Sequence, residues 1–473
     1  MQHWLEQYDL PFMRWKHHPT LLLLAGCLVC QLSFAQTKRS AIGSLMQKAH
    51  RMGLFNGNLL VADKGKIVYS AAIGYADSSQ KVKLTPDHRF HIGSIAKEFN
   101  AVAVMMLVQQ GKLKLNDTVT AWLPDMPAWM GKITILHLLQ YRSGLPNANW
   151  KIAKSDADIM QQLKETAAPV FEPGKSYAYY NTNVFLQRRI IEKVSGISFN
   201  QFVQRYLLQP AKMETALIDP NENDPLVAKS FDNDNRQSSL TSVMSGWTSV
   251  TMTDFYKWAI CLEKFTLLNP ENTRQILIPA ASGQQAGLGK GSMENNQITM
   301  HQHDGTSANY QALLVSHPPK GRTVILLTNN KQNNLSDIND CIQAILDDQP
   351  FTAPRRKFSV AVQNELDTAS ARNLIDRFEK LKIRSPDEFY FNDENEFNAI
   401  GYMLLSKQRI GEAVKIFEYN TTLFPNSGNV WDSMGEAYLK QGKKQDALSC
   451  YKKALALNPA NAAAAKIIAG LEK

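Results

Sequence analysis

The sequence predicts an α/β protein that combines antiparallel hairpins with helices and ends in an all-helical C-terminal module. Two pairs of apolar runs, each pair separated by a short turn, indicate hairpins at residues 58–70 and 310–328. The uncharged run from Phe99 to Gln110 is apolar on nearly every side, so it predicts a buried helix. A 34-residue internal period beyond residue 396 predicts the helical module.

Length and composition indicate two or three domains and no preference for nucleic acid. The chain has 473 residues, of which 44% are hydrophobic, which is enough for a sizeable core. The formal net charge is +9, but the charged residues are interspersed and form no long basic run. Tracking a phosphate backbone needs a continuous basic surface, so we expect no nucleic-acid partner.

The N-terminus has the pattern of an export signal. A basic stretch precedes the apolar run 21–32, and a small-x-small sequence ends at Ala35, which predicts a signal peptide over residues 1–35. The apolar run is short for a membrane span, so we expect no transmembrane span in the mature chain. The alternative is a lipoprotein anchored at Cys27, after Leu24-Ala25-Gly26. Both predict a periplasmic or secreted protein.

The cysteines do not indicate a metal site or a disulfide framework. Cleavage after Ala35 leaves Cys261, Cys341 and Cys450, which are scattered and odd in number. One bond between Cys261 and Cys341 remains open, since an oxidising compartment permits disulfides without requiring them. We expect no metal and no organic cofactor.

Ser94 and Lys97 stand three positions apart at the start of the apolar run. In a helix that begins at Ser94, this spacing places both side chains on one face. An uncharged lysine in a dry site can take the proton of a serine and make it a nucleophile. The helix start also leaves free N–H groups near the serine oxygen. The pattern predicts a nucleophilic serine, although a serine helix cap with a solvated lysine has the same spacing.

The segment from His91 to Asp117, which contains Gly93-Ser94-Ile95-Ala96-Lys97, resembles the active-site helix of the serine β-lactamase and penicillin-binding protein superfamily. It is most similar to the class C β-lactamase and esterase branch. The resemblance covers roughly residues 40–345 and implies a β-lactamase/transpeptidase-like fold, in which an antiparallel sheet is flanked by helices and joined to an all-helical subdomain. It also implies that Ser94 is the nucleophile and Lys97 its proton acceptor.

A second segment, Tyr177-Ala178-Tyr179-Tyr180-Asn181, follows a Pro-Gly turn. By itself it reads as an aromatic loop packed on the core. In the superfamily, a Tyr-x-Asn motif lies across the cleft from the serine and lysine. The resemblance implies that Tyr179 accepts and donates protons and that Asn181 hydrogen-bonds the substrate and the lysine. Tyr141 stands where histidine is usual in another family segment, and we expect a structural role for it.

A third segment, His303-Asp304-Gly305-Thr306, lies at the head of the second hairpin. It resembles the superfamily's lysine-threonine-glycine motif, with His303 in place of lysine and Asp304 in place of threonine. Gly305 allows close approach of a substrate to the backbone. The resemblance implies that His303, Gly305 and Thr306 bind substrate and that the Thr306 and Ser94 N–H groups form an oxyanion hole, worth roughly 3–4 kcal/mol per donor.

The histidine at position 303 also bears on the reaction. A lysine there would offer a permanent cation to a substrate carboxylate, whereas histidine is mostly neutral near pH 7. This favours an esterase or peptidase with weak or no β-lactamase activity. The rival interpretation of the segment is a metal site made by His301, His303 and Asp304, for which no further ligand is visible at a familiar spacing.

The C-terminal part begins with a linker, residues 351–392, that contains an amphipathic helix from Ser370 to Leu381. Residues 393–473 follow, with matched pairs 34 positions apart such as Gly401 and Gly435, and they resemble tetratricopeptide repeats over 396–462. Two repeats are few, so we expect the module to dock on the catalytic domain or on the linker helix. It is either a stabilising appendage or a groove for a peptide or protein partner.

Together these segments predict an exported serine hydrolase that acts through an acyl-enzyme on an ester, an amide or a D-amino-acid peptide. We place its hydrolase domain at residues 36–350. The alternative is a non-catalytic, penicillin-binding-like protein that recognises peptidoglycan or a peptide, with the repeats as its interaction arm.

Overall fold

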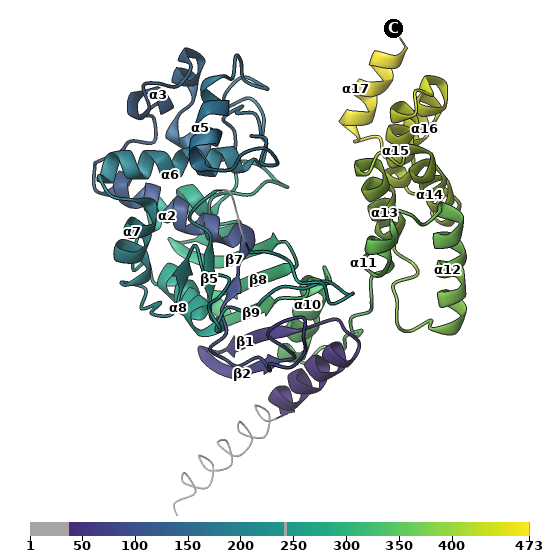
Figure 1. Ribbon diagram of the computed structural model, residues 1–473, viewed down its shortest axis with the longest axis horizontal. Coiled ribbons are helices and arrows are strands. Elements are labelled where there is room, and N and C mark those ends of the chain that lie inside the picture. The colour runs from purple at the N-terminus through teal and green to yellow at the C-terminus, as the bar shows by residue number, and fades with distance from the viewer. Residues whose placement is uncertain (1–36, 241–243, 473) are drawn as a thin grey trace, which may run out of the picture.

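The computed structural model describes residues 37–240 and 244–472 (Figure 1). The signal-peptide and lipoprotein predictions fall on residues 1–35 and lie outside the described residues. Within the described ranges, none of the helices combines the length and the apolar composition that a membrane crossing requires.

A six-stranded antiparallel sheet forms the centre of the larger domain, in the order β2-β1-β9-β8-β7-β6. Both predicted hairpins are present, and β1 pairs with β9, so the two ends of the domain meet in the middle of the sheet. The strands are β1 (Gly57–Asp63), β2 (Lys66–Ile73), β6 (Lys290–Glu294), β7 (Gln297–Ser307), β8 (Tyr310–His317) and β9 (Arg322–Thr328).

Helices cover both faces of this sheet, and for that reason β1 is buried along its whole length. Leu59 and Val61 point to one face, where they share a core with helix 37–51 and with α10 (Leu335–Leu346). Leu60 and Ala62 point to the other face and join the larger core around α2 (Lys97–Gln109). Nearly every residue of α2 is buried, as the apolar run predicts.

An all-helical subdomain lies on the α2 side of the sheet (Figure 1), and α2 packs against its longest helix, α6. A small second sheet, β3-β5-β4, joins the two parts. The remaining elements of this domain are β3 (Phe90–His91), η1 (Gly93–Ala96), α3 (Val119–Trp122), η2 (Ala128–Lys132), α4 (Ile135–Leu139), α5 (Asp156–Lys164), α6 (Asn181–Ser195), α7 (Phe199–Val203), η3 (Gln204–Leu208), β4 (Leu217–Ile218), β5 (Thr248–Val250), α8 (Met252–Glu263), α9 (Pro270–Leu277) and η4 (Pro318–Lys320).

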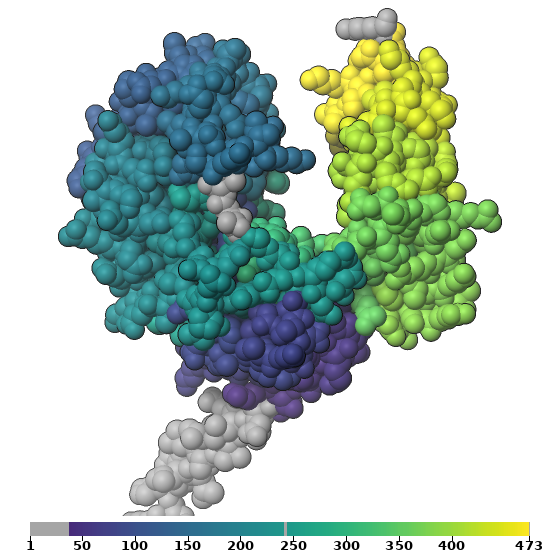
Figure 2. Space-filling view, in the orientation of Figure 1, coloured from purple at the N-terminus to yellow at the C-terminus, as the bar shows by residue number. Residues whose placement is uncertain are grey.

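The C-terminal module has its own core and stands beside the larger domain, joined to it at one end (Figure 2). It docks on the linker helix α12, whose Leu374 and Phe378 pack with Phe397 and Phe417 of the first repeat. The linker contains α11 (Phe358–Val362), η5 (Gln363–Glu365) and α12 (Ala371–Arg384), and the module contains α13 (Glu394–Ser406), α14 (Ile410–Leu423), α15 (Gly428–Lys440), α16 (Lys444–Leu457) and the capping helix α17 (Ala462–Leu471).

The glycines of the 34-residue pairs lie where paired helices cross. A Cβ at Gly401 would lie 2.4 Å from the ring of Phe417, and a Cβ at Gly435 would lie 3.0 Å from the ring of Tyr451. Gly411, in the first turn of α14, has open space instead. The repeat therefore needs its small residue at the crossing and not at every glycine.

We predict opposite effects on stability for two glycine-to-alanine substitutions in this module. Gly401→Ala forces the Phe417 ring to move and lowers the free energy of unfolding of the module by about 1–3 kcal/mol. The matched change Gly411→Ala meets no atom and is neutral or stabilising by up to about 1 kcal/mol. Urea denaturation followed by circular dichroism measures both. Equal effects of the two changes would contradict this account of the crossing.

Candidate active site

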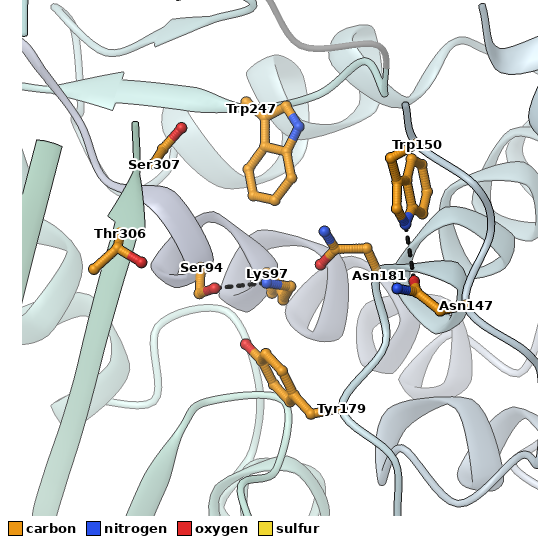
Figure 3. Close-up of a pocket in the computed structure, with 9 residues that line it drawn as sticks. All are labelled: Ser94, Lys97, Asn147, Trp150, Tyr179, Asn181, Trp247, Thr306 and Ser307. Carbon is orange, nitrogen blue, oxygen red and sulfur yellow. Dashed lines mark hydrogen bonds between the residues drawn. The ribbon is translucent and has the colours of Figure 1, made fainter. Parts of the chain in front are cut away.

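Ser94 lies in a short 3-10 turn, η1, that leads directly into α2. The α-helix itself begins at Lys97, three residues later than the spacing predicts, because the turn carries Ser94 out of the preceding strand. The two side chains nevertheless meet, and Lys97 Nζ donates a hydrogen bond to Ser94 Oγ over 2.7 Å (Figure 3). The predicted pairing of Ser94 with Lys97 is thus present in the geometry.

The Lys97 amine is held in a state suited to accept a proton. Only 3% of the residue is exposed, and burial lowers the pKa of Lys97 to about 7. The positive charge of Arg188 lowers this pKa further, while the negative charge of Asp304 acts in the opposite sense. A pKa near 7 means that about half of the lysine is uncharged at neutral pH, so it can take the Ser94 proton.

Tyr179 lies on the loop before α6, opposite Ser94 and Lys97, with its hydroxyl end toward Ser94 (Figure 3). Lys97 Nζ is 4.8 Å from the centre of the Tyr179 ring. The hydroxyl is buried and makes no hydrogen bond of ordinary geometry with a described residue. Burial raises the pKa of Tyr179 to about 12, so the phenol keeps its proton at neutral pH.

Tyr141 fixes the position of the Tyr179 ring, with the two ring centres 4.5 Å apart. Its backbone has a positive φ of 55°, and its carbonyl accepts a hydrogen bond of 2.9 Å from the N–H of Ala178, next to Tyr179. Tyr141 is 2% exposed, and burial raises its pKa well above the usual value. Tyr141 therefore has a structural role, which is to hold Tyr179 in position beside Ser94 and Lys97.

A cavity of about 370 Å³ opens in front of these three residues. Asn181 and Thr306 line it, as the sequence predicts, and four further lining residues escaped sequence analysis. These are Asn147, Trp150, Trp247 and Ser307. Trp150 Nε1 donates a 2.8 Å hydrogen bond to Asn147 Oδ1 (Figure 3). Asn147, Trp150 and Trp247 lie in loops, which have no periodicity or fixed spacing by which a sequence could reveal them, and Ser307 is the last residue of β7.

Gly305 brings β7 against the turn that carries Ser94. A Cβ at Gly305 would lie 2.0 Å from the Ile92 carbonyl oxygen and 3.0 Å from Ser94 N. In the same way, a Cβ at Gly93 would lie 2.5 Å from Thr306 N. Because Gly93 and Gly305 have no side chain, the backbone of β7 can contact the backbone of the turn that carries Ser94. This contact brings the backbone N–H groups of Ser94 and Thr306 close together at the cavity. The predicted oxyanion hole needs this juxtaposition.

His303 lies next to the site but is not among the residues that line the cavity. Along β7, alternation turns His301, His303 and Gly305 toward α2. His303 is 2% exposed, and its Nδ1 lies 2.8 Å from Glu98 Oε1. Its Nε2 has no hydrogen-bond partner among the described residues. A substrate contact by His303 therefore stays a prediction that this side-chain position does not favour.

Glu98, which sequence analysis missed, collects three donors in the core. Its Oε1 is 2.8 Å from His301 Nε2 as well as from His303 Nδ1, and its Oε2 accepts a 2.6 Å hydrogen bond from Trp258 Nε1. Burial raises the pKa of Glu98, but the two histidines outweigh this and lower it to about 2. Glu98 is thus a carboxylate hydrogen-bonded by the rings. In the described part of the chain, no group of three or more His, Cys, Asp or Glu side chains could hold a metal ion.

Arg188 of α6 is a fully buried cation behind the cavity. None of its guanidinium nitrogens has a hydrogen-bond partner among the described residues. The guanidinium carbon lies 5.0 Å from the ring centre of Phe199 and 5.3 Å from that of Trp247, so aromatic faces stabilise its charge. Lys97 Nζ lies 5.4 Å from the centre of the same Trp247 ring. Arg188 is close enough to Lys97 to disfavour a second positive charge there.

We predict that the reactivity of Ser94 rises with pH, with a midpoint at about pH 7. The uncharged lysine is the reactive form, and its fraction grows as the pH rises through the pKa of Lys97. Arg188→Met removes a neighbouring cation, so the Lys97 pKa and the midpoint move upward by about one unit or less. The measurement is the rate at which a fluorophosphonate labels Ser94 as a function of pH. Arg188→Lys keeps the charge and serves as the control, and an unchanged midpoint in folded Arg188→Met would refute the role of the charge.

The three cysteines that remain beyond residue 36, Cys261, Cys341 and Cys450, are free and buried. Burial raises the pKa of each thiol to about 11. They are therefore thiols that pack as small apolar groups, and none of them lines the cavity.

Comparison with known proteins agrees with this geometry. A family model described as Beta-lactamase matches residues 39–346, and a Tetratricopeptide repeat model matches residues 428–461, which is the second repeat. Penicillin-binding protein 4* of Bacillus subtilis is 26% identical over 359 residues, which is 68% of this chain and 79% of that protein.

Two solved structures have the same fold. A penicillin-binding protein from Bacillus halodurans superposes with a TM-score of 0.55 and 22% identity, over 64% of this chain and 98% of that one. A class C β-lactamase mutant superposes with a TM-score of 0.56 and 16% identity, over 65% of this chain and 97% of that one. The resemblance predicted from the sequence is confirmed, for the fold and for both parts of the chain.

Proposed function

Because the chain belongs to the β-lactamase family, we propose that it is a serine hydrolase that acts through an acyl-enzyme on an ester, amide or D-amino-acid peptide. The observation that carries the proposal is the 2.7 Å hydrogen bond from a buried Lys97 amine, with a pKa of about 7, to Ser94 Oγ. A buried lysine without a function would be costly, and here its depressed pKa matches the need of a general base.

In the proposed acylation step, Lys97 Nζ takes the proton of Ser94 as Oγ bonds to the acyl carbon. The carbonyl oxygen becomes an oxyanion, which the Ser94 and Thr306 N–H groups stabilise. The bond to the leaving group then breaks, and the leaving group takes a proton from the Tyr179 hydroxyl. The Lys97 ammonium then gives its proton to Tyr179, so both side chains return to their starting states. A water molecule attacks the acyl-enzyme with help from the same groups and releases the acid.

The order of the two pKa values divides the roles between the side chains. Lys97, at about 7, is the group that accepts a proton at neutral pH, while Tyr179, at about 12, holds its own. The phenol is therefore the donor to the leaving group, and Asn181, across the cavity, orients the substrate. The sequence is compatible with Tyr179 as proton acceptor and as proton donor, and its buried environment favours the role of donor.

The cavity supports esterase or peptidase activity over efficient β-lactamase activity. Among its lining residues the only cationic side chain is Lys97, which has a pKa of about 7. His303, at the place of the lysine in the β-lactamase motif, is turned toward Glu98. A substrate carboxylate, such as that of a penicillin, would therefore find no permanent cation to bind.

The remaining predictions complete the proposal. We propose that residues 1–35 direct export to the periplasm or the exterior, with lipidation at Cys27 as the alternative. We also propose that the hydrolase domain spans residues 36–350, the linker 351–392 and the repeats 393–473, and that the repeats offer a surface for a peptide or protein partner. Comparing the secreted chain with a Cys27→Ser variant by mass spectrometry of its N-terminus tests the two processing routes.

We predict that a fluorophosphonate labels Ser94 in the chain from residue 36 onward and that this chain hydrolyses 4-nitrophenyl esters. Ser94→Ala abolishes both, because among the described residues no other serine is hydrogen-bonded to a buried lysine amine. Ser449→Ala, an exposed serine of α16, changes neither and serves as the control. Peptide mapping locates the label, and D-amino-acid amides and nitrocefin complete the substrate panel. Absence of labelling would favour the binding protein that recognises peptidoglycan or peptide without turnover.

Tyr179→Phe tests the proton donor. We predict that it lowers kcat by about a hundredfold for poor leaving groups, since general acid catalysis contributes on this scale. The loss is smaller for 4-nitrophenol, which leaves without a proton. Steady-state kinetics with an alkyl ester and a 4-nitrophenyl ester of the same acid separate the two cases. An equal loss on both esters would instead indicate that the phenyl ring was displaced.

A further inference from the structure

Asp304 is an exposed carboxylate two residues before Thr306, which lines the catalytic cavity, although Asp304 itself is not one of the lining residues. On β7 it alternates with His303 and Gly305, which face α2, and it shares its face with Thr306, a residue that lines the cavity. The pairing of β6 with β7 begins at Lys290, opposite Gln302, so the part of β7 that follows Gln302 is an edge of the sheet. Asp304 is accordingly exposed, in contrast to the buried residues on either side of it.

The Asp304 carboxylate is not neutralised by a neighbour. It forms no hydrogen bond and no ion pair with another residue of the described ranges. Its charge nevertheless reaches the catalytic centre. Burial and Arg188 lower the pKa of Lys97 while Asp304 raises it, and Asp304 adds to the effect of burial in raising the pKa of Tyr179. The negative charge of Asp304 would therefore interact electrostatically with a charged group of a substrate bound at Ser94.

The rest of the lining also favours a positively charged substrate group. Trp150, Trp247 and Tyr179 line the cavity, and aromatic rings attract ammonium groups. The nearby Arg188 is fully buried behind Trp247 and cannot contact a ligand in the cavity. A substrate carboxylate would meet Asp304 without a permanent cation to offset it, whereas a substrate ammonium would find a free anion and aromatic rings.

We propose that Asp304 makes this cavity select acyl donors that carry an ammonium group on the acyl chain over neutral or anionic donors of similar shape. This inference rests on the proposed hydrolase function and specifies its substrate class. It assigns Asp304 to substrate selection by charge and gives it no part in the bond-breaking steps.

The test uses three 4-nitrophenyl esters of pentanoic acid that differ only at C5, which carries a trimethylammonium, a tert-butyl or a carboxylate group. The first two have the same shape, so their comparison isolates the charge. At low salt, kcat/KM falls about fivefold from the ammonium to the tert-butyl ester and again to the carboxylate ester. Asp304→Asn, which has nearly the same shape, brings the three values within about twofold, and 0.5 M salt reduces the spread in the unaltered protein.

Asp387→Asn is the control, because it removes a carboxylate from the exposed linker and should leave the ranking unchanged. The inference is wrong if the tert-butyl ester is hydrolysed and the ranking is the same with and without Asp304. If none of the esters is hydrolysed, the hydrolase proposal fails instead. Calorimetric titration with pentyltrimethylammonium and with hexanoate then decides the charge preference, which must favour the ammonium and disappear in Asp304→Asn.

Discussion

The burial of one amine beside one hydroxyl is the constraint on which the candidate site depends. Lys97 and Glu98 are neighbours on α2, and both are almost completely buried. Glu98 remains charged because three ring N–H groups converge on it, with a pKa of about 2. Among the described residues, the Ser94 hydroxyl is the hydrogen-bond partner of Lys97, and burial together with the charge of Arg188 lowers the pKa of Lys97 to about 7. The same helix thus carries Glu98, which is buried and charged, and Lys97, which is buried and loses its charge near pH 7. Their protonation states differ because their neighbouring groups differ.

Local pattern was sufficient to predict much of the framework and the proximity of Ser94 and Lys97. Hairpins, the apolar helix and the 34-residue period are short-range signals, and the spacing of Ser94 and Lys97 survives although a 3-10 turn replaces the first helical turn. The walls of the cavity were beyond such signals. Trp247 reaches it because β5 pairs with β3, so that segments about 160 residues apart meet. The contact between Glu98 and His303 likewise joins residues that are far apart in the sequence, so the orientation of His303 could not be predicted from local pattern.

The two parts of the chain are joined more loosely than either is packed. The core of the C-terminal module shares no residue with the two cores of the larger domain. Among the described residues, the junction includes polar contacts such as Arg356 Nε to the Met52 carbonyl, 2.9 Å, and Lys357 Nζ to the Asn333 carbonyl, 2.7 Å. Such contacts contribute little stability each. The α12 helix therefore supplies the apolar support that two repeats lack, and the larger domain does not need to supply it.

In the proposed mechanism, the direction of proton transfer follows from the same effect of burial on pKa. Burial disfavours the charged form of every group, so it lowers the pKa of the amine and raises that of the phenol. Because the pKa of Lys97 is lower than that of Tyr179, the Lys97 amine is the group that can accept a proton and the Tyr179 hydroxyl is the group that can donate one to a substrate at Ser94. Tyr141 keeps the phenol dry and in place through its ring. A lysine in water would be charged and a phenol at the surface would be mobile, so the chemistry depends on the depth of the site as much as on the identity of its residues.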